Sequence, residues 1–140
     1  YWRADARAAI VGLSAGSGRA QVVRAGLESI GFIVGDVLRQ MGQEAGVELQ
    51  MVHADGGAVR NRFLMQFVAD ITGLQVRAAQ VAELSAFGAC LAGGLGCGLY
   101  AGLEQVKRLS AAFEEYTPQM TPERRGELLA GWNSAVQRVL

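Results

Sequence analysis

The stretch that decides how this chain is organised is Met51-Val52-His53-Ala54-Asp55-Gly56-Gly57-Ala58-Val59-Arg60-Asn61. Residues 47–54 form a mostly apolar run of strand length, and the cluster Asp55-Gly56-Gly57 then breaks the pattern. From residue 59 to residue 71 the apolar side chains recur at helical spacing, and Gly73 follows at the place of a helix C-cap. The pattern therefore predicts a short strand, a tight glycine turn and an amphipathic helix.

The double glycine of this turn indicates a place where another group can approach the backbone. Gly56 and Gly57 carry no Cβ, so the chain can turn sharply and leave room beside it. The helix that follows begins with unpaired N–H groups and a partial positive charge. Such strand–turn–helix junctions are common ligand sites in open α/β sheets. The alternative is a plain connection whose glycines serve chain geometry alone, and the local pattern leaves both interpretations open.

Three polar side chains accompany the turn. Asp55 is interpreted either as a turn residue that bonds its own backbone or as a contact to a ligand or metal, and both remain open. Asn61 comes four residues after Gly57, so we expect it one helical turn into the helix, with its side chain over the mouth of the turn. His53 is expected to be packed or hydrogen-bonded. The sequence shows no triad, carboxylate pair, metal cluster or phosphate-binding loop, so it predicts a ligand-facing turn without a catalytic group.

Composition narrows the class of protein. The chain has 140 residues, which is the length of a single domain, and 51% of them are hydrophobic. Thirteen basic and thirteen acidic side chains cancel, which argues against a nucleic-acid binder. Cys90 and Cys97, on one helix, would lie roughly 10 Å apart, too far for a disulfide. Free, buried thiols and the lack of a signal peptide predict a cytoplasmic protein, and the missing initiator Met suggests a piece of a longer chain.

The remaining elements follow from periodicity and capping residues. Before the glycine turn we expect a strand at 9–13 and a helix at 19–42 capped by Ser17. After it we expect a strand at 74–78, parallel to the strand at 47–54, and then a helix at 83–102 capped by Ser85. A helix at 103–109, a loop at 113–121 and a final helix that opens with Thr121 and Pro122 complete the chain. Between Glu83 and Glu104 the chain carries no charged residue, and this stretch is nearly the length of a membrane span. We interpret this stretch as a helix buried against a sheet or another helix through its small residues; a membrane segment is the alternative.

Motifs along the whole chain resemble the FGGY family of carbohydrate kinases. The run from Asp55 to Asn61, with the helix up to Gly73, is similar to the second signature of that family. Further matching segments are Tyr1-Trp2, Asp5-Ala6-Arg7, Ile10-Val11-Gly12-Leu13, Leu27-Glu28-Ser29-Ile30, Ala86-Phe87-Gly88-Ala89 and Gly131-Trp132. The resemblance implies an α/β chain with an incomplete actin-like, ribonuclease H-like ATPase domain, namely part of the C-terminal domain of a two-domain kinase.

The resemblance also implies ATP and Mg²⁺ as cofactors, with this chain on the adenosine side of the ATP site. By motif, Gly57 and Asn61 contact the nucleotide, Gly56 and Ala58 are their backbone neighbours, and Asp55 precedes them. The family's catalytic aspartate, polyol-binding residues and phosphate-binding loops fall before Tyr1. The resemblance therefore places no catalytic residue or metal ligand in this chain, and we expect the chain alone to be inactive.

Within the family, the motifs are most similar to the members that phosphorylate glycerol to glycerol 3-phosphate. Departures at Ser14-Ala15, Arg62, Leu84-Ser85 and Phe87 leave two alternatives open: a kinase for another polyol or sugar such as xylulose, or a degenerate, non-catalytic nucleotide-binding module. The implied partners are the N-terminal domain of the same kinase, ATP or ADP, and glycerol or a related polyol bound mainly by that other part. A homo-oligomer is also implied, without nucleic acid or membrane.

Overall fold

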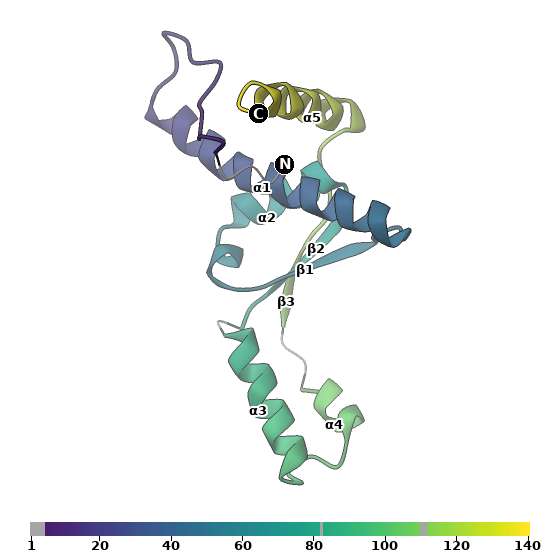
Figure 1. Cartoon of the computed structure of the whole chain (residues 1–140). Coiled ribbons are helices and arrows are strands. Elements are labelled where there is room, and N and C mark those ends of the chain that lie inside the picture. Colours follow the sequence, from purple (N-terminus) through teal and green to yellow (C-terminus); the bar gives the residue numbers. More distant parts are fainter. Residues whose placement is uncertain (1–4, 82, 110–111) are drawn as a thin grey trace.

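The computed structural model describes residues 5–81, 83–109 and 112–140. The elements in chain order are α1 (Arg19–Ala45), β1 (Met51–Ala54), the 3₁₀ helix η1 (Gly57–Arg60), α2 (Arg62–Thr72), β2 (Gln75–Ala79), α3 (Leu84–Gly96), α4 (Leu103–Lys107), β3 (Phe113–Tyr116) and α5 (Pro122–Gln137) (Figure 1).

The described strands form one mixed sheet in the order β1-β2-β3. β1 and β2 are parallel, with Val52 opposite Val76, so the predicted strand–helix–strand unit is confirmed. β3 is antiparallel to β2 and occupies part of the segment that was expected to be a loop, so that expectation was wrong. Its sequence Phe-Glu-Glu-Tyr contains two acidic residues, and each forms an ion pair. Glu114 contacts Arg62 at 3.0 Å, and Glu115 contacts Arg77 at 2.9 Å.

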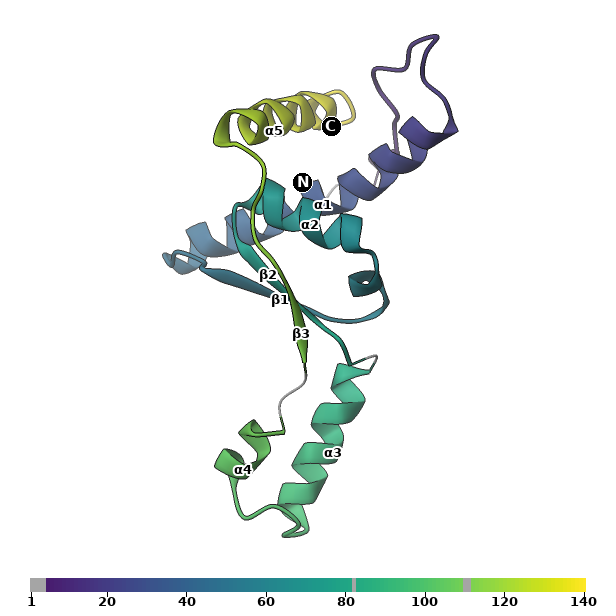
Figure 2. The same ribbon diagram turned by 180° about the vertical axis from the view of Figure 1, so that it is seen from behind.

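The core lies between α2 and one face of this sheet. It is made of Leu64, Met65, Val68, Ala69, Val76, Ala78 and Tyr116. α1 packs on the outer side of α2, and a Cβ on Gly31 would come within 2.5 Å of the Phe67 ring, so glycine permits the close approach of these helices. α5 packs on α1 through Trp132, which stacks on Phe32 with ring centroids 5.0 Å apart, and it lies on the side of the sheet away from α3 and α4 (Figures 1 and 2).

Helix ends show which capping predictions hold. Gly73 ends α2 in the left-handed conformation, as predicted, and the Thr121 hydroxyl accepts from the Arg124 N–H at 3.3 Å to cap α5. The prediction of Ser17 as the cap of α1 was wrong: Gly18 occupies that position, and the Ser17 hydroxyl accepts from the Ser14 N–H instead. Residues 9–13 are not a strand, because no neighbouring strand among the described residues pairs with them.

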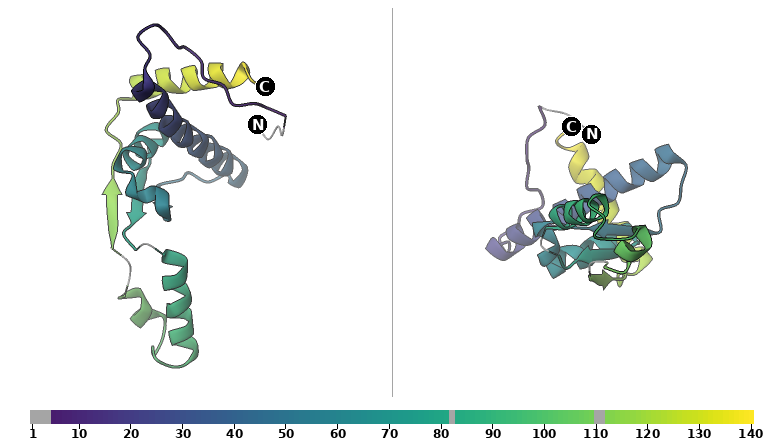
Figure 3. Two further views of the ribbon diagram at one scale, coloured as in Figure 1. Left: turned by 90° about the vertical axis from the view of Figure 1, so that its left-hand side faces the viewer. Right: turned by 90° about the horizontal axis from the view of Figure 1, so that it is seen from below.

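α3 and α4 form a hairpin that projects away from the sheet (Figure 3). The expectation of a buried helix here was wrong, since Gly94 is the one buried residue of α3 among those described. Glu83, and not Ser85, takes the N-cap position. Cys90 and Cys97 are free, as predicted, but exposed. Across the described ranges, no helix combines the length and the apolar character needed to cross a membrane.

Candidate functional site

The glycine turn lies at the edge of the sheet where the parallel strands end. β1 and β2 run side by side, so their last residues, Ala54 and Ala79, meet at the same edge. The turn follows β1 there, and β2 leads towards α3 at the same side (Figure 2). The structure therefore places the predicted site at the carboxyl edge of the sheet, beside the base of the α3–α4 hairpin.

The two glycines of the turn are there for different reasons. Gly56 has φ +83° and ψ −173°, a conformation that is nearly restricted to glycine, so chain geometry requires it. Gly57 has no positive φ, and a Cβ added to it would meet no atom within 4 Å among the described residues. Neither the backbone nor the packing of the described residues requires a glycine at position 57, as is also true of exposed helix glycines such as Gly26 and Gly131. The open space in front of Gly57 is available to a ligand.

Asn61 joins η1 to α2, and this corrects the expectation that it lies one turn inside a helix. A short 3₁₀ helix separates the turn from α2, and Asn61 is the N-cap, with φ −86° and ψ +94°. Its Oδ1 accepts from the Leu64 N–H at 3.1 Å. In the part of the chain that the structure describes, its Nδ2 amide donates no hydrogen bond. The acceptor half of Asn61 thus stabilises α2, and its donor half is left for another group.

Further hydrogen-bonding groups are unoccupied around the turn. The Val59 and Asn61 N–H groups donate to the carbonyls of Gly56 and Ala58. The N–H groups of Gly57 and Ala58 have no acceptor among residues 5–81, 83–109 and 112–140. The exposed Asp55 carboxylate accepts no hydrogen bond from the described residues either, so the turn in which Asp55 bonds its own backbone is not observed. His53 lies outside this group, with its ring perpendicular to that of Phe113 and the two ring centroids 5.6 Å apart.

The predicted site residues are thus brought together, since Asp55, Gly56, Gly57 and Ala58 form one continuous turn that η1 links to Asn61. The described residues contain no cluster of three or more side chains suited to a metal ion. Asp55 supplies the one carboxylate of the turn itself, and Mg²⁺ in nucleotide sites is commonly held by one or two carboxylates together with phosphates and water. The groups of the turn can thus donate hydrogen bonds to a ligand through the backbone and Asn61 and accept them through Asp55.

Contacts that fix the start of α2 were not found from the sequence. Arg62 forms an ion pair with Glu114 of β3, and the Arg24 guanidinium of α1 lies 4.4 Å from the centre of the Phe63 ring. Both contacts join segments that are far apart in the chain, so no local signal exists for them. Tyr116 lies beneath this helix; burial raises its pKa above the ordinary 10.0, and the nearby Glu114 raises it further. The Tyr116 hydroxyl is buried and forms no hydrogen bond with the described residues.

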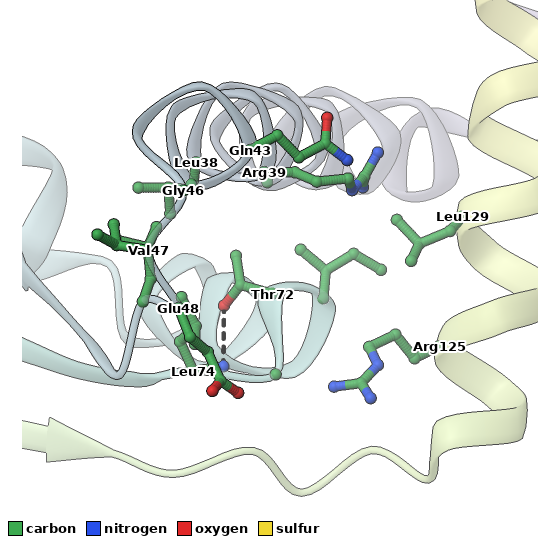
Figure 4. Close-up of a pocket in the computed structure, with 15 residues that line it drawn as sticks. Leu38, Arg39, Gln43, Gly46, Val47, Glu48, Thr72, Leu74, Arg125 and Leu129 are labelled. Atoms are coloured by element: carbon green, nitrogen blue, oxygen red, sulfur yellow. Dashed lines mark hydrogen bonds between the residues drawn. The ribbon is translucent and has the colours of Figure 1, made fainter.

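A separate groove of about 630 Å³ lies between α1, the end of α2 and α5. Figure 4 shows Arg39 and Gln43 on α1 above it and Arg125 reaching in from α5. Arg125 lies against Gly73, at the carboxyl end of α2, where a cation is favoured by the helix dipole. None of the residues 55–61 lines this groove. The groove and the glycine turn are therefore distinct sites.

Comparison with known proteins gives a consistent result. Residues 1–97 match the model of the FGGY family of carbohydrate kinases, C-terminal domain. The chain is 41% identical to a glycerol kinase of Shewanella halifaxensis over 138 residues and 43% identical to that of Pseudomonas tolaasii over 138 residues. These alignments cover 99% of this chain but only 28% and 27% of the relatives. The chain thus spans little more than a quarter of the length of the curated relatives it matches.

Solved structures agree in fold. A crystal structure of Plasmodium falciparum glycerol kinase with ADP is similar with a TM-score of 0.90 and 32% identity, over 99% of this chain and 28% of that one. A ligand-bound xylulose kinase from Lactobacillus acidophilus has a TM-score of 0.74 at 21% identity, over 97% of this chain and 28% of that one, which shows the fold alone. The expected fold, an incomplete α/β domain of the actin-like ATPase type, is confirmed by these neighbours.

Proposed function

This chain belongs to the FGGY family of carbohydrate kinases, and we propose that its glycine turn forms the adenosine side of the ATP site of a kinase that phosphorylates glycerol. The observation that supports this most is Gly57, which combines open space in front of its α-carbon with a backbone N–H that has no acceptor among the described residues. A nucleotide that approaches this backbone would need the absence of a side chain. Gly56 supplies the sharp turn that presents this backbone.

Each group of the turn has a role in this proposal. The N–H groups of Gly57 and Ala58 donate to oxygen atoms of the nucleotide, and the Asn61 Nδ2 amide donates to an acceptor on its ribose or base. Asn61 can do so while its Oδ1 still caps α2. Asp55 offers an acceptor for a hydroxyl or amino group. Mg²⁺ would neutralise charge on the ATP phosphates, and we assign its protein ligands to the remaining part of the kinase.

The activity proposed for the whole kinase is transfer of the ATP γ-phosphoryl group to a glycerol hydroxyl, which gives ADP and glycerol 3-phosphate. This chain matches only 28% of the length of its glycerol kinase relatives, so the groups that bind the polyol and activate its hydroxyl are assigned to the remaining part. Phosphoryl transfer depends on positioning and on charge neutralisation around the phosphates. The chain by itself is therefore expected to be inactive, and to work with an N-terminal domain of the same kinase in the cytoplasm.

Glycerol is preferred over other substrates because of sequence identity. The relatives at 41–43% identity are glycerol kinases, whereas the xylulose kinase and gluconate kinase structures are only 21% identical. A non-catalytic nucleotide-binding module is the other candidate, and kinase activity of the whole protein separates the two. The homo-oligomer implied by the resemblance stays a prediction.

The test separates the two halves of the Asn61 side chain. Asn61→Asp keeps an oxygen to accept from Leu64 but removes the Nδ2 donors, so it should leave the free energy of unfolding nearly unchanged and weaken ADP binding about tenfold. ADP binding is measured by titration calorimetry and stability by urea unfolding. Asn133→Asp on the exposed face of α5 is the matched control and should change neither. Unchanged ADP affinity in Asn61→Asp would contradict the proposed role.

A further inference from the structure

Three consecutive residues at the start of α2 are each fixed by a different part of the fold. Asn61 caps the helix through Leu64. The Nη2 atom of Arg62 contacts Oε1 of Glu114 on β3 at 3.0 Å. The ring of Phe63 lies under the guanidinium of Arg24 on α1 at 4.4 Å, and the Nε of Arg24 is itself held by Glu28 at 2.7 Å. The residue that faces the nucleotide is thus followed directly by two contacts to elements outside α2.

The start of α2 needs such contacts because its own sequence stabilises it poorly. The first turn contains no acidic residue, and Arg62 places a positive charge at the positive end of the helix dipole. The chain also changes from a 3₁₀ helix to an α-helix at this point, with extended backbone at Asn61. Glu114 supplies the missing negative charge from β3. Arg24 fixes the half-buried Phe63, which also stacks on Phe67 with ring centroids 6.1 Å apart.

We propose that Glu114 and Arg24 are positioning residues for the nucleotide site: from β3 and from α1 they hold the first turn of α2, and through it the Asn61 amide, in the binding orientation. This inference rests on the proposed function of the turn. Binding groups must be held to within a fraction of an ångström, and that precision comes from neighbours that lock them. Both contacts involve well-exposed arginines, so they add little to global stability. Their loss should therefore loosen the site without unfolding the chain.

The test compares two disrupted contacts with a matched control. Glu114→Gln removes the charge that faces Arg62, and Arg24→Gln removes the cation over Phe63. Glu104→Gln breaks an exposed ion pair of similar length, Glu104 to Lys107 at 2.6 Å, on α4 of the hairpin. Three readouts are taken for each: ADP affinity by calorimetry, amide hydrogen exchange at Leu64, and the urea midpoint. Leu64 exchange reports directly on the cap, since its N–H is bound by Asn61.

We expect Glu114→Gln and Arg24→Gln to weaken ADP binding three- to tenfold and to speed Leu64 exchange, with nearly unchanged urea midpoints, while Glu104→Gln changes none of these. The charge-exchanged pair, Arg62→Glu with Glu114→Arg, should recover most of the affinity lost in Glu114→Gln. A merely structural role would lower the urea midpoint and would speed Leu64 exchange only as much as the loss of global stability requires. That result would overturn the inference. ADP binding equal in wild type and variants overturns this inference alone, whereas no ADP binding by the wild-type chain overturns the proposed function as well.

Discussion

α2 and α3 are both rich in apolar and small residues, yet α2 is largely buried and α3 is largely exposed. Six of the eleven residues of α2 are buried, whereas Gly94 is the one buried residue of the thirteen in α3. The apolar side chains of α2 gather on the side that meets the sheet and α1. The four large apolar side chains of α3, those of Leu84, Phe87, Leu91 and Leu95, lie on one face of the helix but are only half-buried, and α3 projects away from the sheet (Figure 3). An apolar sequence predicts a helix, but burial depends on whether a partner surface is within reach.

The candidate site lies where these two regions meet. The glycine turn belongs to the packed unit, because β1, η1 and α2 carry it, and it opens towards the base of the hairpin (Figure 2). A rigid unit can hold Asn61 in place while the space in front of Gly57 stays open. If the unit of β1, η1 and α2 is well packed and the hairpin is not, substitutions in the two regions should have unequal effects on stability.

Replacing a core aromatic residue should give the largest effect. Phe67 packs with Phe32 and Ile71, so Phe67→Ala should lower the free energy of unfolding by about 3–5 kcal/mol, as for other buried aromatic residues. Leu103→Ala in the hairpin, where the side chain is 66% exposed, should cost less than about 0.5 kcal/mol. Urea unfolding measures both. Similar losses in the two variants would show that the hairpin is as well packed as the core.

Substitution of Gly56 should mainly lower stability, whereas substitution of Gly57 should mainly lower the affinity for ADP. Gly56→Ala forces a side chain into a conformation reserved for glycine and should cost about 1–3 kcal/mol. Gly57→Ala should change stability by less than about 0.5 kcal/mol, since its Cβ meets open space, yet weaken ADP binding. Thermal unfolding and ADP titration of both variants make the comparison. An ADP affinity unaffected by Gly57→Ala would remove the main support for the site.

Loss of the hydrogen bond between α5 and α1 should lower the free energy of unfolding more than loss of the Tyr100 hydroxyl in the hairpin. The Trp132 Nε1–H donates to Oδ2 of Asp36 at 2.7 Å, so Trp132→Phe should cost about 1–2 kcal/mol through the loss of a bond to a charged acceptor. Tyr100→Phe, in the segment after α3, removes a hydroxyl that forms no hydrogen bond with the described residues. It should cost less than about 0.5 kcal/mol in the same urea experiment. A larger loss for Tyr100→Phe would contradict this order.

The smallest effect should appear only at alkaline pH. Burial and then Glu114 raise the pKa of Tyr116 in the folded chain, so the unfolded chain loses this proton first, near its ordinary value of 10.0. The unfolded state therefore binds fewer protons there, and stability falls as pH rises from about 10 through the raised pKa. In Tyr116→Phe this part of the alkaline loss should vanish. Urea unfolding at pH 8 and pH 11 measures it, and an identical pH dependence in both proteins would be contrary to the burial of this hydroxyl.

Local patterns predicted the turn and most helices correctly, because their signals lie within a few residues. Asp55-Gly56-Gly57, the cap at Gly73 and the Thr121-Pro122 start of α5 all appear where expected. β3 was missed since its glutamates are stabilised by Arg62 and Arg77, which are distant in sequence. The placement of Asn61 was wrong because the pattern of apolar residues does not distinguish a 3₁₀ turn from the first turn of an α-helix.

The sequence could not show which other elements each helix or strand contacts. The small residues of α3 suggested tight packing, but a sequence does not show whether the packing surface is within the same 140 residues. The contacts of Arg24 and Glu114 to the start of α2 join segments brought together only by the fold. The role assigned to Gly57, in contrast, needed both sources: the motif singled it out, and the structure removed the geometric explanation.

The most direct test of the central claim is an ADP titration of this chain, followed by amide chemical shifts in NMR spectra. If the turn is the nucleotide site, saturable shifts will centre on Gly57, Ala58 and the backbone and side-chain amides of Asn61. The groove between α1, α2 and α5 serves as the internal comparison, through the amides of Gly46 and Gly73. Shifts centred on that groove, with Gly57 and Asn61 unmoved at saturating ADP, would contradict the account.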